Sequence, residues 1–275
     1  MNKNWLTRTA AALMAAAVLF GGGMTAQAAE NVDTQDDISL WVGDSRTVLI
    51  YQDLNMKAPN GTAYRNKAKV SGGYLYLTYR DCYAARGSGY DLVLKADSKI
   101  KRVVDKEGRQ NVVFSSGLND LYKTEVNPFS TRVNGKKVTA SPETLAKKYW
   151  KLYKKNYIKK YPEDHFYITS MNPVYSALYY RGNSVTNDKV VRFNKKMKSL
   201  IAKSSFENVS YVDTYKNIFK KQGLIHKKSA YRYALKYRTT NVRYMRESSS
   251  YQLHFSDKVN KMIYNYVNQF IEQDQ

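Results

Sequence analysis

The sequence predicts an α/β protein with a central, mostly parallel five-stranded sheet that is covered by helices on both faces. Short apolar segments alternate with longer amphipathic ones, a pattern typical of parallel strands joined by crossover helices. No internal repeat or linker indicates a second domain. The expected strands are 38–42, 82–85, 111–114, 165–169 and 209–212, and 74–79 is expected to be an extra strand or a lead into the next one.

Helices are expected between these strands. The clearest begins at Pro142, because Ser141 is a favourable N-cap and proline fits the first helical position. Its apolar residues share one face as far as Tyr161, and Pro162 then ends it. Further helices are expected at 47–50, at 90–95, from Asn187 and from 256–257 onward. Outside this framework lie 123–140, which we expect to form a hairpin or lid, and the basic, tyrosine-rich segment 215–249.

The first 29 residues resemble a secretory signal. Lys3 and Arg8 form a charged start, 10–20 is apolar, and 26–28 is a small-residue cleavage site. That apolar part is too short to span a bilayer comfortably, and no other segment is long and apolar enough. We therefore expect a secreted, extracellular or cell-wall-associated protein with one domain over 30–275 and no stable membrane insertion after cleavage.

Composition limits the function classes. The chain has 45 Lys and Arg against 23 Asp and Glu, and its net charge is +22. The single Cys82 excludes an intrachain disulfide and is expected to be buried. Metal-ligand spacing is absent, so we expect no metal and no other cofactor. The basic residues are spread along the chain without a nucleic-acid-binding motif, which disfavours nucleic acid and favours an anionic cell-wall polymer as partner.

Ser45 is the first candidate for chemistry. It follows a predicted strand and Gly43, at a strand-to-helix junction. Ligands collect at the carboxyl edge of open α/β sheets, and N–H groups at a helix start favour a developing negative charge. The alternative interpretation is that Asp44 and Ser45 form a helix N-cap without any chemistry.

Three further residues are expected at the same edge. Gly87 and Asn119 follow the second and third predicted strands, and His254 precedes the last helix. Ser45 would attack a carbonyl carbon, and His254 would accept its proton and pass it to the leaving alcohol. The backbone N–H groups of Ser45 and Gly87, with the Asn119 amide, would bind the oxyanion. Each also has a structural alternative: a tight turn at Gly87, a loop cap at Asn119 and a half-buried ring at His254.

Together these motifs resemble those of the SGNH (GDSL-type) hydrolases, in the exported form found in Gram-positive bacteria. The matching segments are 43–47, 87–91, 117–121, 172–174, 193–194, 211–215 and 253–256. The resemblance implies a flavodoxin-like, three-layer α/β/α fold and hydrolysis of esters, often acetyl groups on carbohydrate. It also implies that Ser45 is the nucleophile, Gly87 and Asn119 are oxyanion donors, and His254 is the base.

One position departs from the family pattern. The family usually has an aspartate three residues before the histidine, where this chain has Tyr251. Such an aspartate orients the imidazole and stabilises the imidazolium. Three outcomes stay open: a backbone carbonyl orients His254, another carboxylate such as Glu247 or Asp257 does so, or the site has become a binding pocket. Asp44 and Tyr251 are further candidates for the orienting role.

The sequence therefore predicts an exported serine esterase or deacetylase that removes O-acyl groups, such as acetyl, from an envelope or extracellular glycan or from a small ester. The alternative is a catalytically weak or inactive protein of the same fold that binds cell-wall polysaccharide.

Overall fold

The computed structural model describes residues 39–54, 69–71, 74–78, 82–85, 89–97, 100–101, 111–121, 131–133, 136–138, 141–180, 183–232 and 253–274. The chain divides into two units, Met1–Val32 and Asp33–Gln275, and every described residue belongs to the second. The expected signal segment and its cleavage site lie outside the described residues and stay predictions. Within the described ranges, every helix is too short or too polar to cross a bilayer.

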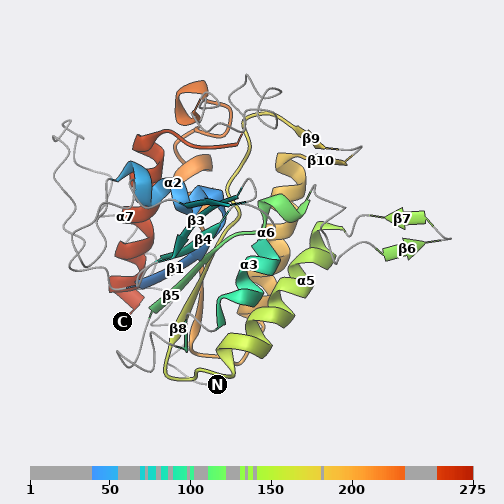
Figure 1. Ribbon diagram of the computed structural model, residues 1–275, viewed down its shortest axis with the longest axis vertical. Coiled ribbons are helices and arrows are strands. Elements are labelled where there is room, and N and C mark those ends of the chain that lie inside the picture. Colours follow the sequence, from blue (N-terminus) through green and yellow to red (C-terminus); the bar gives the residue numbers. More distant parts are fainter. Residues whose placement is uncertain are drawn as a thin grey trace. The chain divides into compact units, whose positions relative to one another are not determined.

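The described strands of the centre form one seven-stranded sheet (Figure 1). Its parallel strands are β1 (Ser39–Gly43), β4 (Cys82–Ala85), β5 (Asn111–Ser115), β8 (His165–Thr169) and β11 (Val209–Val212). The order β11-β8-β5-β1-β4 is the flavodoxin-like order, with the reversal between β1 and β5. All five predicted strands are confirmed. The expected extra strand at 74–79 is also present as β3 (Tyr74–Thr78), and β3 and the unpredicted β2 (Lys69–Ser71) widen the sheet as antiparallel strands.

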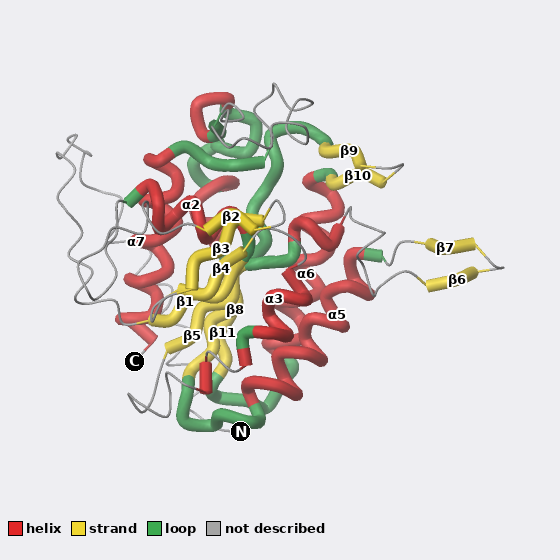
Figure 2. The backbone as a smooth tube through the Cα atoms, in the orientation of Figure 1, coloured by secondary structure: helices red, strands yellow, loops and turns green. Residues whose placement is uncertain are grey.

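Helices cover both faces of this sheet and make the three layers that the resemblance implied (Figures 1 and 2). One layer holds α2 (Ser45–Asp53) and α7 (Asp257–Asp274). The other holds α3 (Gly89–Lys95), α5 (Pro142–Tyr153) and α6 (Asn187–Ala202). Two small hairpins lie apart from the sheet (Figure 2): β6 (Thr131–Val133) with β7 (Lys136–Val138), inside the segment expected to form a hairpin, and β9 (Leu178–Tyr180) with β10 (Asn183–Val185), which was not predicted.

Strand β1 shows why a continuous apolar run is needed at the centre of the sheet. Trp41 stacks on Tyr264 of α7 at 5.7 Å between ring centroids and meets Tyr51 of α2 edge-on at 6.4 Å. Leu40 and Val42, with the opposite side-chain direction, join the core beneath α3, α5 and α6. A parallel strand buried on both faces has no solvent side, so polar alternation is absent from it.

Helix α5 supplies aromatic side chains to that core. Tyr153 and Tyr157 lie 4.7 and 5.0 Å from the ring of Phe114. The regular helix ends at Tyr153 rather than at the predicted Tyr161, and a π-helix, η4 (Lys154–Ile158), continues it. An α-helical turn has about 3.6 residues, so side chains that are spaced four apart shift gradually around the helix and away from a single face. The wider turn takes up this drift, and Tyr157 stays fully buried.

The predicted N-cap of α5 is confirmed, since Ser141 Oγ accepts a hydrogen bond from Thr144 N at 3.2 Å. We expect Ser141→Ala to lower the free energy of unfolding by about 1 kcal/mol, because one helix-end N–H loses its partner. Urea denaturation of both proteins measures this difference. Ser141→Asp, which keeps a side-chain acceptor, serves as the control and should stay close to the wild type. An alanine variant with an unchanged midpoint and slope would contradict this account.

Candidate active site

Ser45 and His254 meet at the carboxyl edge of the sheet. Ser45 is the first residue of α2 and is separated from the end of β1 by Asp44 alone, and His254 lies just before α7. Although the two residues are 209 positions apart in the chain, Ser45 Oγ lies 3.2 Å from His254 Nε2. This is the distance at which an imidazole can accept a hydroxyl proton. The structure therefore brings together the predicted nucleophile and the predicted base.

The residues around Ser45 explain the Gly-Asp-Ser sequence. A Cβ at Gly43 would lie 1.9 Å from Thr47 Oγ1 and 2.5 Å from the Ser115 carbonyl, so only glycine fits there. Asp44 caps α2, because its Oδ1 accepts from Arg46 N at 3.0 Å. The N-cap interpretation thus holds for Asp44. The hydroxyl of Ser45 has a different partner, the imidazole of His254.

Asn119 follows β5 in a short 3₁₀-helix, η3 (Leu118–Leu121), and is buried. Strands β1 and β5 are neighbours, with Gly43 paired to Ser115, so Ser45 and Asn119 follow adjacent strand ends. This is the point where the strand order reverses, which is where open α/β sheets bind ligands. The N–H of Ser45, in the first turn of α2, has no partner within the helix. The two predicted oxyanion donors on described residues thus lie at one switch point.

Two neighbours of Asn119 hold its loop in place. Gly117 has φ +116°, a conformation that L side chains rarely adopt, and a Cβ there would also lie 3.1 Å from Met171 Cε. Asp120 Oδ2 accepts from Tyr149 Oη at 2.6 Å and from Tyr90 N at 3.2 Å. Burial, with the nearby Asp120 carboxylate as a smaller cause, raises the pKa of Tyr149, so its hydroxyl stays protonated and donates.

The segment that carries His254 is paired with residues 230–232. Arg232 N donates to the His254 carbonyl at 2.9 Å, and Ser256 N donates to the Ala230 carbonyl at 3.0 Å. The Arg232 guanidinium in turn bonds Asp53, at the end of α2, and Asp257, at the start of α7. Burial raises the pKa of Asp53, against the lowering effect of its bonds to Arg232 and Asn260. No motif in the sequence predicts this pairing, because the residues that it joins share no pattern.

Three predicted residues, Gly87, Glu247 and Tyr251, lie outside the described residues. Their suggested roles as oxyanion donor and orienting groups therefore stay predictions. Asp257 is largely exposed, and its Oδ1 accepts from Arg232. Cys82 lies in β4, and its expected burial likewise concerns a side chain outside the description.

The loop after β8 completes this edge, and its bracing by asparagines was also missed. Asn194 of α6 bonds both the N–H and the carbonyl of Met171, each at 2.8 Å. Asn187, also on α6, bonds both the N–H and the carbonyl of Val174, each at 2.9 Å. Each amide side chain thus imitates a strand partner for an irregular backbone. The loop between them is held rigidly, which fixes the direction of its carbonyl groups.

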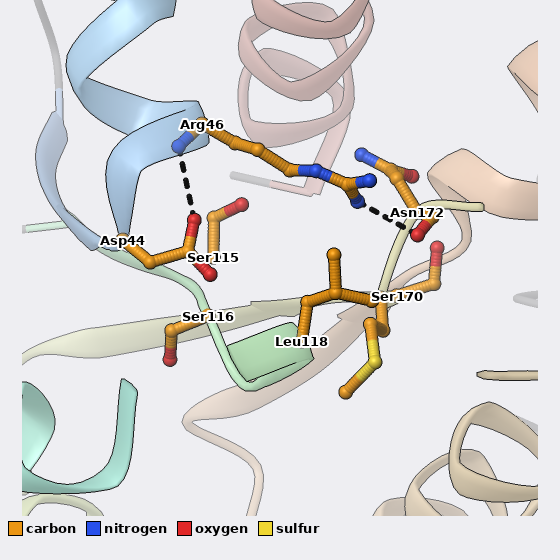
Figure 3. Close-up of a pocket in the computed structure, with 8 residues that line it drawn as sticks. Asp44, Arg46, Ser115, Ser116, Leu118, Ser170 and Asn172 are labelled. Atoms are coloured by element: carbon orange, nitrogen blue, oxygen red, sulfur yellow. Dashed lines mark hydrogen bonds between the residues drawn. The ribbon is translucent and has the colours of Figure 1, made fainter. Parts of the chain in front are cut away.

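Figure 3 shows a small cavity at the ends of β1, β5 and β8, with Arg46 extending across it from α2 towards Asn172. Its volume is about 20 Å³, enough for one water molecule. Asp44 and Arg46, the two neighbours of Ser45, contribute to its lining, together with Ser116 and Ser170. Across the described part of the chain, no three His, Cys, Asp or Glu side chains gather in a way that would hold a metal ion.

Comparison with known proteins does not identify a function for this chain. No family model matches the chain, and no curated protein matches it. A solved structure from Streptococcus pneumonia, provisionally described as that of a platelet activating factor, is similar with 12% sequence identity and a TM-score of 0.48. The match covers 85% of this chain and 83% of the other. A functional assignment therefore has to be argued from the distances and contacts described above.

The Asp120–Tyr149 hydrogen bond is expected to couple the η3 loop to α5. In a double-mutant cycle of Asp120→Ala and Tyr149→Phe, each single change should lower the free energy of unfolding by about 1–3 kcal/mol, because a buried polar group loses its partner. The double variant should be less destabilised than the sum of the two. Chemical denaturation of the four proteins measures the coupling, and strictly additive effects would show that the two side chains do not interact.

Proposed function

We propose that this protein is a serine ester hydrolase of the SGNH type that removes short O-acyl groups, foremost acetyl, from an envelope or extracellular glycan. The observation that carries the proposal is the 3.2 Å contact between Ser45 Oγ and His254 Nε2. It lies at the switch point of a flavodoxin-like sheet, with Asn119 after the adjacent strand. A nucleophile, a base and an amide donor are the parts that acyl transfer requires.

In the proposed reaction, Ser45 Oγ attacks the ester carbonyl carbon while His254 Nε2 accepts the hydroxyl proton. The negative charge that develops on the carbonyl oxygen is stabilised by the N–H of Ser45 and the side-chain amide of Asn119. The imidazolium then protonates the departing alcohol oxygen, which leaves an acyl group on Ser45. Water, deprotonated by His254, attacks this acyl-enzyme, and the carboxylic acid leaves as the serine hydroxyl is regenerated.

The surroundings of the nucleophile favour a short acyl group. Ser45 is only 9% exposed, so little space is open beside its hydroxyl. A long acyl chain would need a sizeable apolar cavity beside it. The excess of lysine and arginine over acidic residues favours a substrate carried on an anionic polymer, which would attract the protein by its charge.

Ser45→Ala is expected to abolish turnover of p-nitrophenyl acetate, because no other atom replaces the nucleophile. His254→Ala should remove most of the rate, and Asn119→Ala should lower kcat by about 10²–10³, the cost of losing one oxyanion donor. Initial rates of the purified proteins measure these effects. Ser199→Ala on α6 and the exposed His226→Ala are matched controls and should keep the wild-type rate.

Release of acetate from acetylated glycans tests the natural class of substrate with the same variants. The hydrolase proposal would be refuted if the wild-type protein hydrolysed the small ester and every acetylated glycan no faster than Ser45→Ala does.

A second candidate function is binding of an anionic polymer without chemistry. The stretch 214–232 contains no Asp or Glu, and its five lysines are exposed. It includes a π-helix, η5 (Tyr215–Lys220), and a short 3₁₀-helix, η6 (Lys228–Ala230), and it pairs directly with the His254 segment. We call its exposed lysines the basic rim: Lys216, Lys220, Lys221, Lys227 and Lys228. The basic rim would attract phosphate- or carboxylate-bearing polymer to the same edge as the candidate site.

Replacing Lys220, Lys221, Lys227 and Lys228 with glutamine is expected to weaken retention on purified cell wall. The difference from the wild type should be largest at low salt, because at high salt screening weakens the electrostatic attraction of the wild type too. Sedimentation of the protein with the wall material across a salt series measures this. The matched control replaces four exposed lysines in the helical layer that holds α5 and α6: Lys151, Lys155, Lys159 and Lys195. Equal losses in the two variants would show that total charge, rather than the basic rim, governs retention.

A further inference from the structure

Arg46 is a buried guanidinium beside the candidate nucleophile. Only 8% of the residue is exposed, and it stands next to Ser45 in the first turn of α2. Its side chain donates to three backbone carbonyls: Nη1 to Asn172 at 2.7 Å, Nη2 to Pro173 at 2.6 Å and Nε to Leu253 at 3.0 Å. The guanidinium carbon also lies 4.4 Å from the centre of the Phe255 ring.

These contacts bracket His254 on both sides. Leu253, which precedes the histidine, accepts a hydrogen bond from Arg46, and Phe255, which follows it, presents its ring face to the same guanidinium. Two adjacent residues of α2 therefore contact adjacent residues of the His254 segment. Ser45 meets the imidazole, and Arg46 meets the backbone beside it.

The other end of the guanidinium is held by the rigid loop after β8. Asn187 and Asn194 of α6 fix the backbone on both sides of Asn172 and Pro173, whose carbonyls accept from Arg46. Figure 3 shows the side chain of Arg46 spanning the distance from α2 to Asn172. The position of the guanidinium is thus determined by α2 and α6, elements that pack on opposite faces of the sheet.

We propose that Arg46 is a positioning residue that holds the His254 imidazole against Ser45 by clamping the backbone on both sides of the histidine. This inference rests on the proposed hydrolase function. Arg46 does not touch the reacting atoms in this role; it acts through the 253–255 backbone. A planar guanidinium with five donors can serve three carbonyls and an aromatic face at once, whereas a lysine ammonium is a compact point charge without that fork.

The test is Arg46→Lys, assayed on p-nitrophenyl acetate in the wild-type and in the His254→Ala background. We expect kcat to fall about 10–100-fold with KM changed less than about twofold. A displacement of a catalytic group by about 1 Å can lower the rate by a factor of this order. In the His254→Ala background the same substitution should change the residual rate by less than about twofold, because the group that it positions is absent.

Arg192→Lys is the matched control, because Arg192 lies on α6 and its bond to Glu143 is on the surface. It should leave kcat unchanged. Thermal unfolding shows whether each variant is folded at the assay temperature. If Arg46→Lys does not fold, Phe255→Leu tests the same clamp by removing only the ring beneath the guanidinium, and it should lower kcat with KM little changed.

The outcomes separate this inference from the hydrolase proposal. A wild-type protein without esterase activity refutes the proposed function itself. An active wild type with a fully active Arg46→Lys variant overturns the positioning role. A loss of rate that is equally large with and without His254 also overturns it, because Arg46 would then act on Ser45 or on the oxyanion donors rather than through the histidine.

Discussion

The geometry at the sheet edge depends on one buried guanidinium that satisfies carbonyl groups from two distant parts of the chain. Arg46 lies on α2, and its hydrogen bonds reach the loop after β8 and the segment before α7. Each of these segments leaves the regular structure at this edge, so its carbonyls need partners that no strand or helix provides. A charged donor supplies strong hydrogen bonds to them in a buried position. The position of Ser45 relative to His254 follows from that arrangement.

Several residues of the family-like motifs act on the backbone rather than on a substrate. Gly43 leaves room for Thr47 and the Ser115 carbonyl, Gly117 adopts a positive φ, and Asp44 caps α2. Asn194 fixes the loop after β8 through two hydrogen bonds to Met171. These residues hold the two strand-end turns and the loop after β8 in place, and Ser45, Asn119 and His254 remain the candidates for chemistry. Most of the motif residues at this edge thus position the backbone, and a small number are candidates for chemistry.

Local signals in the sequence were sufficient for much of the framework. Short apolar runs located the five parallel strands, and Ser141 with Pro142 located the start of α5. The same signals failed where a long-range contact decides the outcome. The π-helical turn after Tyr153 follows from the packing of Tyr157 in the core, and the pairing of 230–232 with the His254 segment depends on the position of α7.

The sequence by itself determined the α/β class, the parallel strands and the identity of Ser45, Asn119 and His254 as candidates, because burial patterns and strand-end motifs are local properties. Only the tertiary structure decided that Ser45 Oγ and His254 Nε2 lie 3.2 Å apart and that Arg46 binds the backbone around the histidine. No local sequence pattern links residue 46 to residue 253. Their contact exists because parallel strands deliver their carboxyl ends to one edge, where turns of unrelated sequence must satisfy one another's polar groups.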